Sequence, residues 1–245
     1  STTVTGAESL KAQSSDALTA EAWFRPTNIC TGTAAYCNLM GREGDWLLAF
    51  NNGELTFITY NSTGWNSWQT TGVNLPLNQW SHVAITKNTS TTWTIYVNGA
   101  KVYSTSQSYS PQANNTYLFY VGNRVGGAYP IRGSIDEVRL WKTDRGTSVA
   151  SDMTSTAVSG TNLVAYWNFN EASGTTAYNQ IASASEGTDL TLSTSAMFDA
   201  DVVSTQVQSG AYTLRTFKRS YLTLNGGWKA PAGITRVTTV LVAGG

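Results

Sequence analysis

The sequence predicts an all-β fold, namely a two-sheet antiparallel jelly-roll sandwich. Stretches rich in valine, isoleucine, threonine and aromatic residues recur roughly every 10 to 15 residues, and glycine, proline, asparagine and serine separate them. One segment, residues 147–157, favours a helix, but it is short and rich in serine and threonine. Strands joined by turns, with almost no helix, are typical of an antiparallel sandwich.

Each expected strand ends at a turn signal or a proline. The stretch ALTAEAWFRP, residues 17–26, alternates until its proline. An NNG turn makes residues 46–60 a hairpin, and Asn98-Gly99 supplies the positive φ angles of a type I′ turn in a second hairpin, residues 91–105. Further strands are expected at residues 78–88, 116–123, 133–141 and 163–170.

The character of the chain changes near residue 200, so we expect two parts, residues 1–199 and residues 200–245. The first part is long enough for one sandwich domain. The second part is rich in β-forming residues and ends in the stretch RVTTVLV. Its length of about 45 residues is too small for a generous core. We therefore expect it to be incomplete, or to pack on the first domain or on a partner subunit.

The chain carries few charges. Fifteen basic and 15 acidic residues give a formal net charge of zero, and charged residues make up 12% of the chain, about half the usual share. Nucleic-acid binding and polybasic membrane binding both need clustered cations, so the composition argues against these two partners. No apolar run of about 18 residues is present, so we expect no membrane-spanning helix.

The two cysteines, Cys30 and Cys37, enclose the short stretch TGTAAY. We expect a disulfide that closes this loop, which favours an oxidising compartment. The alternative is half of a metal site. The chain has one histidine and no further cysteine, so a zinc site lacks ligands.

Five motifs in this order resemble the laminin-G-like, concanavalin A-like jelly-roll family of bacterial surface and secreted proteins. They are ALTAEAWFRPTN, NQWSHVAITKNTSTTWTIYVNGAKV, YVGNR, GSIDEVRLWKTDRG and LVAYWNFNEASGTTAYN, and they extend over roughly residues 15–195. The resemblance implies a two-sheet sandwich that serves as an extracellular binding or adhesion module. Some members of this family bind glycans, some bind proteins, and many carry a calcium ion.

The C-terminal part resembles the entry to glycine-rich surface-protein modules. In these modules a short tryptophan- and proline-containing motif precedes a strand and then a run of glycines. The matching residues are Trp228, Pro231, Ala232, Gly233, Ile234 and Thr235.

The stretch GSIDEVRLW places two acids side by side, Asp136 and Glu137. Strict alternation in a strand puts Glu137 on one face with Arg139 and Trp141, and Asp136 on the other with Val138 and Leu140. The resemblance places this strand beside the one that carries Glu21 and Trp23. We therefore expect a structural charge pair between Arg139 and either Glu21 or Glu137, beside the two indoles, because a buried unpaired charge is costly.

Catalysis is the least favoured function. A glycoside hydrolase needs two carboxyl groups that face one cleft, whereas alternation turns Asp136 and Glu137 apart. The single histidine, His82, lies within an expected strand, where a structural role is more common, and the motif G-x-S-x-G does not occur. We therefore expect a protein that is not an enzyme.

A structural calcium ion is a further expectation. The resemblance nominates Asp136 as a ligand, with Glu8 or Asp16 as partners. Calcium takes six to eight oxygen ligands, and the acid-rich entry typical of the family is missing before residue 15. The alternative is that Asp136 is a solvated or turn-capping residue.

Two loops are candidate ligand-binding elements. Residues 60–72, YNSTGWNSWQTTG, place Trp65 and Trp68 in a polar loop, where exposed indoles are costly unless covered or used. Aromatic faces beside amide groups suit sugar rings, so this loop predicts glycan binding, although one indole could instead fold onto the core. The binding residues that we expect here and in the second loop, GNRVGGAYP, are Tyr60, Trp65, Trp68, Arg124 and Tyr129.

These observations leave three hypotheses. The first is a secreted or cell-surface bacterial module that binds a glycan or a cell-surface protein without catalysis. The second is a structural or tip domain of an oligomeric surface fibre, which could form a homo-oligomer through residues 200–245. The third and least favoured is an enzyme of the glycoside hydrolase type.

Overall fold

The computed structural model describes most of the chain up to residue 192 and a short hairpin beyond it. Two compact units are present, Ser1–Phe198 and Asp199–Gly245. For the three segments 2–4, 205–209 and 212–216, the description covers the backbone alone. The described residues are 2–4, 15–28, 30, 36–112, 118–155, 159–171, 174–181, 189–192, 205–209 and 212–216.

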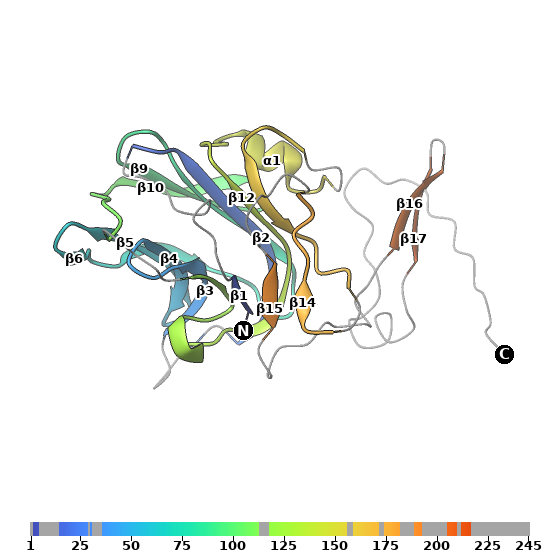
Figure 1. Ribbon diagram of the computed structural model, residues 1–245, viewed down its shortest axis with the longest axis horizontal. Helices are drawn as coiled ribbons and strands as arrows, with labels where there is room; N and C mark the ends of the chain where they lie inside the picture. The colour runs from blue at the N-terminus through green and yellow to red at the C-terminus, as the bar shows by residue number, and fades with distance from the viewer. Residues whose placement is uncertain are drawn as a thin grey trace. The chain divides into compact units, whose positions relative to one another are not determined.

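The first unit contains two antiparallel sheets that form a sandwich, so the predicted all-β jelly-roll class is confirmed (Figure 1). The larger sheet has nine strands in the order β14-β15-β1-β11-β3-β4-β5-β6, and β7 also pairs with β5. Its strands are β1 (Thr2–Val4), β3 (Tyr36–Arg42), β4 (Trp46–Asn51), β5 (Glu54–Asn61), β6 (Gly64–Trp65), β7 (Gln69–Asn74), β11 (Phe119–Val121), β14 (Thr176–Ala177) and β15 (Leu190–Leu192).

The smaller sheet has six strands in the order β10-β9-β8-β2-β12-β13. Two neighbouring inner strands, β2 and β12, carry the motifs ALTAEAWFRP and GSIDEVRLW. The strands are β2 (Leu18–Asn28), β8 (Ser81–Lys87), β9 (Thr92–Val97), β10 (Ala100–Ser106), β12 (Arg132–Trp141) and β13 (Leu163–Trp167).

Aromatic side chains from the two sheets meet in one core. Three ring pairs join one strand of each sheet, with centroids 5.6 to 6.1 Å apart. Such pairs add about 0.5–1.5 kcal/mol each beyond the apolar area that they bury. The pairs are Phe24–Phe50, Phe57–Trp93 and Phe119–Trp167.

The two predicted hairpins form as expected. Strands β4 and β5 pair from Asn51 and Glu54 onward, and β9 and β10 pair on either side of Asn98 and Gly99. In the second hairpin, Asn98 and Gly99 have positive φ angles of 50° and 79°, as a type I′ turn requires. A Cβ at position 99 would lie 2.9 Å from Cα of Ala150, so glycine also permits a close approach of the neighbouring helix.

The predicted helix is shorter than expected, because α1 spans Ser148–Asp152. Its buried residue, Val149, packs with Ala84 and Tyr96 on the face of the smaller sheet that points away from the core. A second short helical turn, η3 (Val125–Gly127), follows β11. The smaller sheet is therefore covered on both faces where α1 lies, which explains why every residue of β8 is buried.

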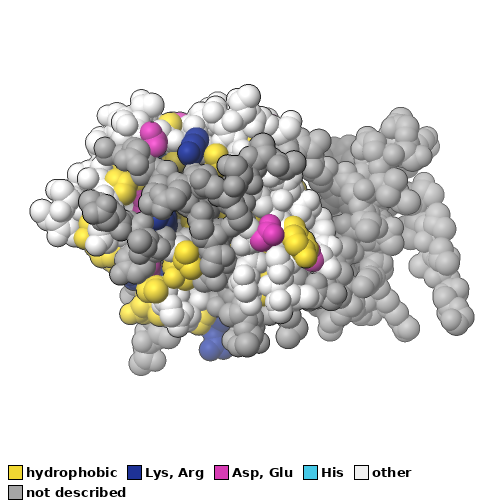
Figure 2. All heavy atoms as spheres, in the orientation of Figure 1, with side chains coloured by type: hydrophobic (Ala, Val, Ile, Leu, Met, Phe, Trp, Pro, Cys, Tyr) yellow, Lys and Arg dark blue, Asp and Glu magenta, His cyan; other side chains and the backbone are white. Residues whose placement is uncertain are grey.

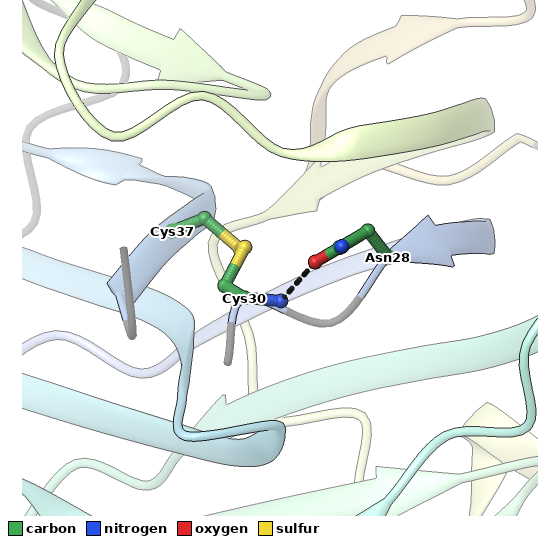
Figure 3. The surroundings of a disulfide bond; sticks show 3 residues. All are labelled: Asn28, Cys30 and Cys37. Atoms are coloured by element: carbon green, nitrogen blue, oxygen red, sulfur yellow. Dashed lines mark hydrogen bonds between the residues drawn. A yellow bond between two sulfur atoms is a disulfide. The ribbon is translucent and has the colours of Figure 1, made fainter. Parts of the chain in front are cut away.

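The predicted disulfide is confirmed (Figure 3). It links Cys30, just beyond β2, to Cys37 in β3, with Cα atoms 6.0 Å apart. The backbone N–H of Cys30 also donates to Oδ1 of Asn28 at 2.7 Å. Because β2 and β3 belong to different sheets, the bond fastens one sheet of the sandwich to the other.

The second unit contains one described hairpin, β16 (Thr205–Ser209) and β17 (Tyr212–Thr216). The expected strand RVTTVLV and the motif that resembles a glycine-rich module lie outside the described residues. The expectation that this part is incomplete or packs on a partner therefore stays a prediction.

Candidate functional site

The two adjacent acids do not follow the alternation that the sequence predicts, because β12 bulges between them. Asp136 pairs with Trp23 and Arg139 with Glu21, so three steps along β12 match two steps along β2. Glu137 takes up the extra residue with a φ of +53°. The register places Asp136 on the same face as Arg139. The prediction that Asp136 shares a face with Val138 and Leu140 is therefore wrong.

Four ionisable side chains form a buried charge cluster on this outer face: Glu21, His82, Glu137 and Arg139. Glu21, His82 and Arg139 are at most 1% exposed. Nη2 of Arg139 lies 2.5 Å from a carboxylate oxygen of Glu137, and its Nη1 lies 3.9 Å from Glu21. Nε2 of His82 is 3.4 Å from the other oxygen of Glu21. The structure thus brings Arg139 together with both glutamates that the sequence nominated.

Both indoles expected near the pair help to enclose it. Nε1 of Trp141 donates to Glu21 at 2.9 Å, and the ring of Trp23 meets His82 edge-on at 5.4 Å. Burial alone would raise the pKa of Glu21, but His82, Arg139 and Trp141 together outweigh it and hold that pKa below its ordinary value. Glu21 is therefore a buried carboxylate kept ionised by its neighbours.

The same cluster anchors the segment that carries α1. Arg139 donates to the carbonyls of Asp152 at 3.1 Å and Ser155 at 2.7 Å, and Nε1 of Trp23 donates to the carbonyl of Met153 at 2.9 Å. A guanidinium at a helix C-terminus satisfies carbonyls that have no partner within the helix. The cluster thus joins β2 and β12 to the segment of α1, and most of its polar atoms are shielded from solvent.

In the described part of the chain, no group of three or more histidine, cysteine, aspartate or glutamate side chains could hold a metal ion. Burial, and next Glu137, raise the pKa of Asp136 to about 7. Asp136 accepts a hydrogen bond from the backbone of Glu137. The carbonyl of Asp16 accepts one from Lys87, and Glu8 lies outside the described residues. Calcium binding therefore stays a prediction.

The two loops with candidate binding residues meet at one place, around the guanidinium of Arg124. Its Cζ atom lies 5.6 to 5.9 Å from three ring centroids, those of Tyr36, Trp65 and Tyr129. Tyr36 in turn contacts both Trp68 and Tyr129, each at 4.8 Å. We name this group the aromatic platform; its rings are Tyr36, Tyr60, Trp65, Trp68 and Tyr129.

Strands of the larger sheet hold the platform in place. Tyr36 begins β3 and Tyr60 lies in β5. Tyr60 pairs with Trp65 of β6, and their rings meet edge-on at 5.4 Å. Tyr129 follows η3, and its carbonyl accepts a hydrogen bond from the backbone of Asn38 at 2.9 Å. Elements distant in sequence thus bring the five rings to one part of the sandwich.

A glutamate that the sequence analysis missed neutralises the arginine of the platform. Glu43 accepts hydrogen bonds from Nε of Arg124 at 2.5 Å and from its Nη2 at 2.8 Å. This two-point contact is the strong form of an arginine–carboxylate pair. The hydrogen bonds that Glu43 accepts raise the pKa of Arg124, so the guanidinium stays protonated and the adjacent carboxylate balances its charge.

The amides of the tryptophan loop hold the loop itself in shape. Asn61 accepts from the backbone of Thr63 and Gly64, and its amide donates to Asn66. The amide of Asn66 then donates to the carbonyl of Ser108 at 2.7 Å, which ties the loop to the segment after β10. Both amides therefore order the loop that carries Trp65.

The platform reaches the surface. Trp65 and Trp68 are both partly exposed, so neither indole has folded fully into the core. Tyr129 is 49% exposed, and Val125 in η3 is 42% exposed. Hydrophobic side chains lie at the surface in the lower left of Figure 2, where η3 is found, and the described part of that face carries few charged side chains.

Two platform residues carried only weak signals in the sequence. Tyr36 precedes Cys37 in a short stretch that we had assigned to the disulfide loop. Glu43 lies in the turn GREGD, and an acid in a turn is usually solvated. In a chain with so few charges, an acid between two apolar strands is a sign of a specific partner, but nothing in the sequence identifies Arg124 as that partner.

The two antiparallel sheets define a sandwich of the concanavalin A-like class. A family profile described as the concanavalin A-like lectin/glucanases superfamily, laminin G type, matches residues 2–149. The chain belongs to this superfamily, as the motifs of the first sandwich strands indicated.

Solved structures share the fold at low identity. A candidate carbohydrate-binding protein from Bacteroides ovatus is 21% identical, with a TM-score of 0.61; the match covers 81% of this chain and 59% of that one. The chain thus spans less than two thirds of that relative. A domain of an extracellular arabinanase from Geobacillus stearothermophilus, solved with arabinotriose, is 17% identical, with a TM-score of 0.48 and coverages of 62% and 71%.

A third similar structure is a carbohydrate-binding module of a Ruminococcus gnavus sialidase bound to α2,3-sialyllactose. It is 15% identical, with a TM-score of 0.48 and coverages of 60% of this chain and 92% of that one. A search of curated protein sequences finds no significant match. Within the described residues, no helix has the length and apolar character needed to cross a membrane.

Proposed function

We propose that the chain is a non-catalytic extracellular module that binds glycans on the aromatic platform. The observation that carries the proposal is the convergence of five aromatic rings and one arginine from distant parts of the sequence into a half-exposed cluster. Sugar rings present apolar C–H faces that stack on aromatic rings and hydroxyls that form hydrogen bonds. The platform offers both kinds of contact.

The platform is also rigid, which favours binding. The Asn61 and Asn66 hydrogen bonds fix the loop of Trp65, and the disulfide at Cys37 fixes the strand that begins with Tyr36. A ligand that binds to ordered rings loses less conformational entropy than one that must order them. A disulfide is also typical of secreted proteins, which agrees with an extracellular location.

The chemistry of the platform favours binding over hydrolysis. Its carboxylate, Glu43, uses both oxygens to bind Arg124, so it is poorly placed to act as a general acid or nucleophile. In the other cluster, Glu21 is 0% exposed and Glu137 is 19% exposed, and Arg139 lies between them as their counter-charge. Hydrolysis of a glycoside needs two carboxyl groups facing one substrate. The Bacteroides ovatus protein of similar fold, a candidate carbohydrate-binding protein, also supports a glycan ligand.

A glycan array tests the proposal with three single variants. Trp65→Ala and Trp68→Ala should each weaken binding at least about tenfold, equivalent to about 1.4 kcal/mol. Trp80→Ala is the matched control, because Trp80 is also partly exposed and lies under an arginine, Arg25 at 5.6 Å, outside the platform. Equal loss in all three variants, or no bound glycan for the wild type, would contradict the proposal.

The second hypothesis, a domain of an oligomeric surface fibre, predicts that the purified protein associates with itself. Val125 and Tyr129 are exposed apolar side chains that could contact another copy of the chain. Sedimentation at increasing protein concentration should then show self-association that Tyr129→Ser removes. A monomer that binds glycan supports the platform as a sugar site.

A further inference from the structure

We infer that the platform selects uncharged oligosaccharides and discriminates against sialylated, sulfated or uronic-acid-containing ones. This inference rests on the proposed function and adds the class of glycan. The feature behind it is the ion pair of Arg124 and Glu43, which places a neutral pair, and not a free cation, among the rings.

The geometry of the pair leaves no unmatched positive charge for an acidic sugar. A guanidinium can bind a carboxylate or sulfate through its Nε–Nη2 edge or through its Nη1–Nη2 edge. Glu43 occupies the first edge at 2.5 and 2.8 Å, and its negative charge offsets the positive charge at the second. The Glu43 side chain is 7% exposed, so it lies beneath the surface and cannot simply swing into solvent. An acidic glycan would have to displace it or approach a second negative charge.

The charges that act on the nearby hydroxyl of Tyr36 come from the ion pair itself. Burial raises the pKa of Tyr36, so its hydroxyl remains protonated and neutral. The charged groups that act on this hydroxyl are Arg124 and Glu43, which have opposite sign. The charges of Arg124 and Glu43 therefore act in opposite directions at this hydroxyl.

Arg124 can still contribute to a neutral ligand. A guanidinium has five N–H donors, of which Glu43 accepts two. The Arg124 side chain is 22% exposed, so part of it is accessible to ligand. The remaining donors suit sugar hydroxyl oxygens, which accept hydrogen bonds without needing a counter-charge. Stacking on the rings together with these donors is a recognition mode for uncharged sugars.

The experiment compares wild type with Glu43→Gln on matched glycan pairs that differ only in the acidic group, such as lactosides with and without a terminal sialic acid, and sulfated and desulfated oligosaccharides. For the wild type, the neutral member of a pair should bind at least about tenfold more tightly. Glu43→Gln keeps an acceptor for Arg124 but removes the negative charge. It should improve binding of the acidic member relative to the neutral member at least about tenfold, with a gain that falls as salt rises.

Asp144→Asn is the matched control, because it makes the same change in net charge at an exposed side chain beyond β12. Asp144 uses one oxygen to accept from the backbone of Gly146, and asparagine retains that acceptor. This variant should keep the preference of the wild type. A gain of acidic binding equal to that of Glu43→Gln would show that overall charge, and not the platform pair, sets the preference, which overturns the inference.

The other outcomes separate the inference from the proposed function. Wild type that binds acidic members as tightly as neutral ones would overturn the inference and leave glycan binding intact. Wild type that binds no member of any pair would remove the proposed function. The wild-type ratio alone decides the preference, so the test holds even if Glu43→Gln does not fold. A folded Glu43→Gln without any gain for acidic glycans would also overturn the charge-matching mechanism.

Discussion

Two arginines of this chain have nearly the same partners and very different surroundings. Arg124 and Arg139 each bind a glutamate at 2.5 Å and lie over aromatic rings, Arg139 over Tyr166 at 5.3 Å. The Arg139 side chain is 1% exposed and lies under the segment of α1, whereas that of Arg124 is 22% exposed and lies in the half-open platform. The two clusters have similar chemistry, and they differ in exposure because the segment of α1 covers Arg139.

An arginine–glutamate pair can therefore be structural when it is fully buried, or remain accessible to a ligand when it is partly exposed. A fully desolvated charge must be matched, so the partners of Arg139 hold β2, β12 and α1 in a single arrangement. A half-exposed pair contributes little to stability, but it leaves rings and N–H donors accessible to a ligand. The four predictions below compare the two clusters by stability, pH and binding.

The largest expected effect is the loss of stability in Arg139→Met. This change leaves Glu21 buried at 0% exposure without its guanidinium and leaves two backbone carbonyls of the α1 segment without their donor. Breaking one side of a buried pair costs about 3–5 kcal/mol. Urea unfolding followed by tryptophan fluorescence should show this decrease in the free energy of unfolding. A decrease below about 1 kcal/mol would mean that the cluster is not structural.

The second effect concerns the disulfide, which adjoins the platform and not the buried charge cluster. The double variant Cys30→Ser/Cys37→Ser should lower the free energy of unfolding by about 2–3 kcal/mol, because a short closed loop restricts the unfolded chain. Tyr36 directly precedes Cys37, so glycan binding should weaken as well. Urea unfolding measures the change in stability, and calorimetric titration measures the change in binding, each for the oxidised protein and for the double variant. Lower stability with unchanged binding would show that the platform keeps its shape without the bond.

The sequence predicts features that depend on residues close together in the chain better than features that depend on distant residues. Strands, hairpins and the Asn98-Gly99 turn follow from local patterns, and they formed as expected. The disulfide followed from two cysteines with few other ligands in the chain. These features depend on neighbours along the chain or on simple counting, which is the information that a single sequence contains.

The parts that were missed depend on register and on distant neighbours. The bulge at Glu137 shifts the alternation by one residue, and no residue of GSIDEVRLW signals it in advance. The pairing of Glu43 with Arg124 joins residues 81 positions apart. The expected aromatic residues were found at one place, but the sequence alone gave no reason for Tyr36 to join them.

The third effect is a dependence on pH that belongs to the buried charge cluster. The folded pKa of Glu21 lies below its unfolded value of about 4.5, so below that pH the unfolded state binds more protons than the folded state. The stability that ionised Glu21 provides is therefore complete above pH 4.5 and is lost as the pH falls through the folded pKa.

Glu21→Gln should flatten this acid limb by up to about 1.4 kcal/mol per pH unit, the equivalent of one proton. Urea midpoints between pH 3 and pH 7 measure it for wild type and variant. The variant will also be less stable at pH 7, because Arg139 then keeps only one carboxylate partner, Glu137. The slope, and not the absolute stability, decides this prediction, and identical slopes would show that Glu21 gains nothing from its partners.

The smallest effect on stability should come from Arg124→Met, the counterpart of Arg139→Met in the exposed cluster. The Arg124 guanidinium is partly solvated and methionine retains apolar contact with the rings, but Glu43 is 7% exposed and loses its partner. We therefore expect a loss of about 1–2 kcal/mol in the free energy of unfolding, smaller than that of Arg139→Met. Glycan binding should nevertheless weaken about tenfold or more, because the remaining N–H donors and the order of the three surrounding rings are lost together. Unfolding and titration on the same preparation give both values. If Arg124→Met were as destabilising as Arg139→Met, the platform would be a second structural cluster, and its exposed rings would need another explanation.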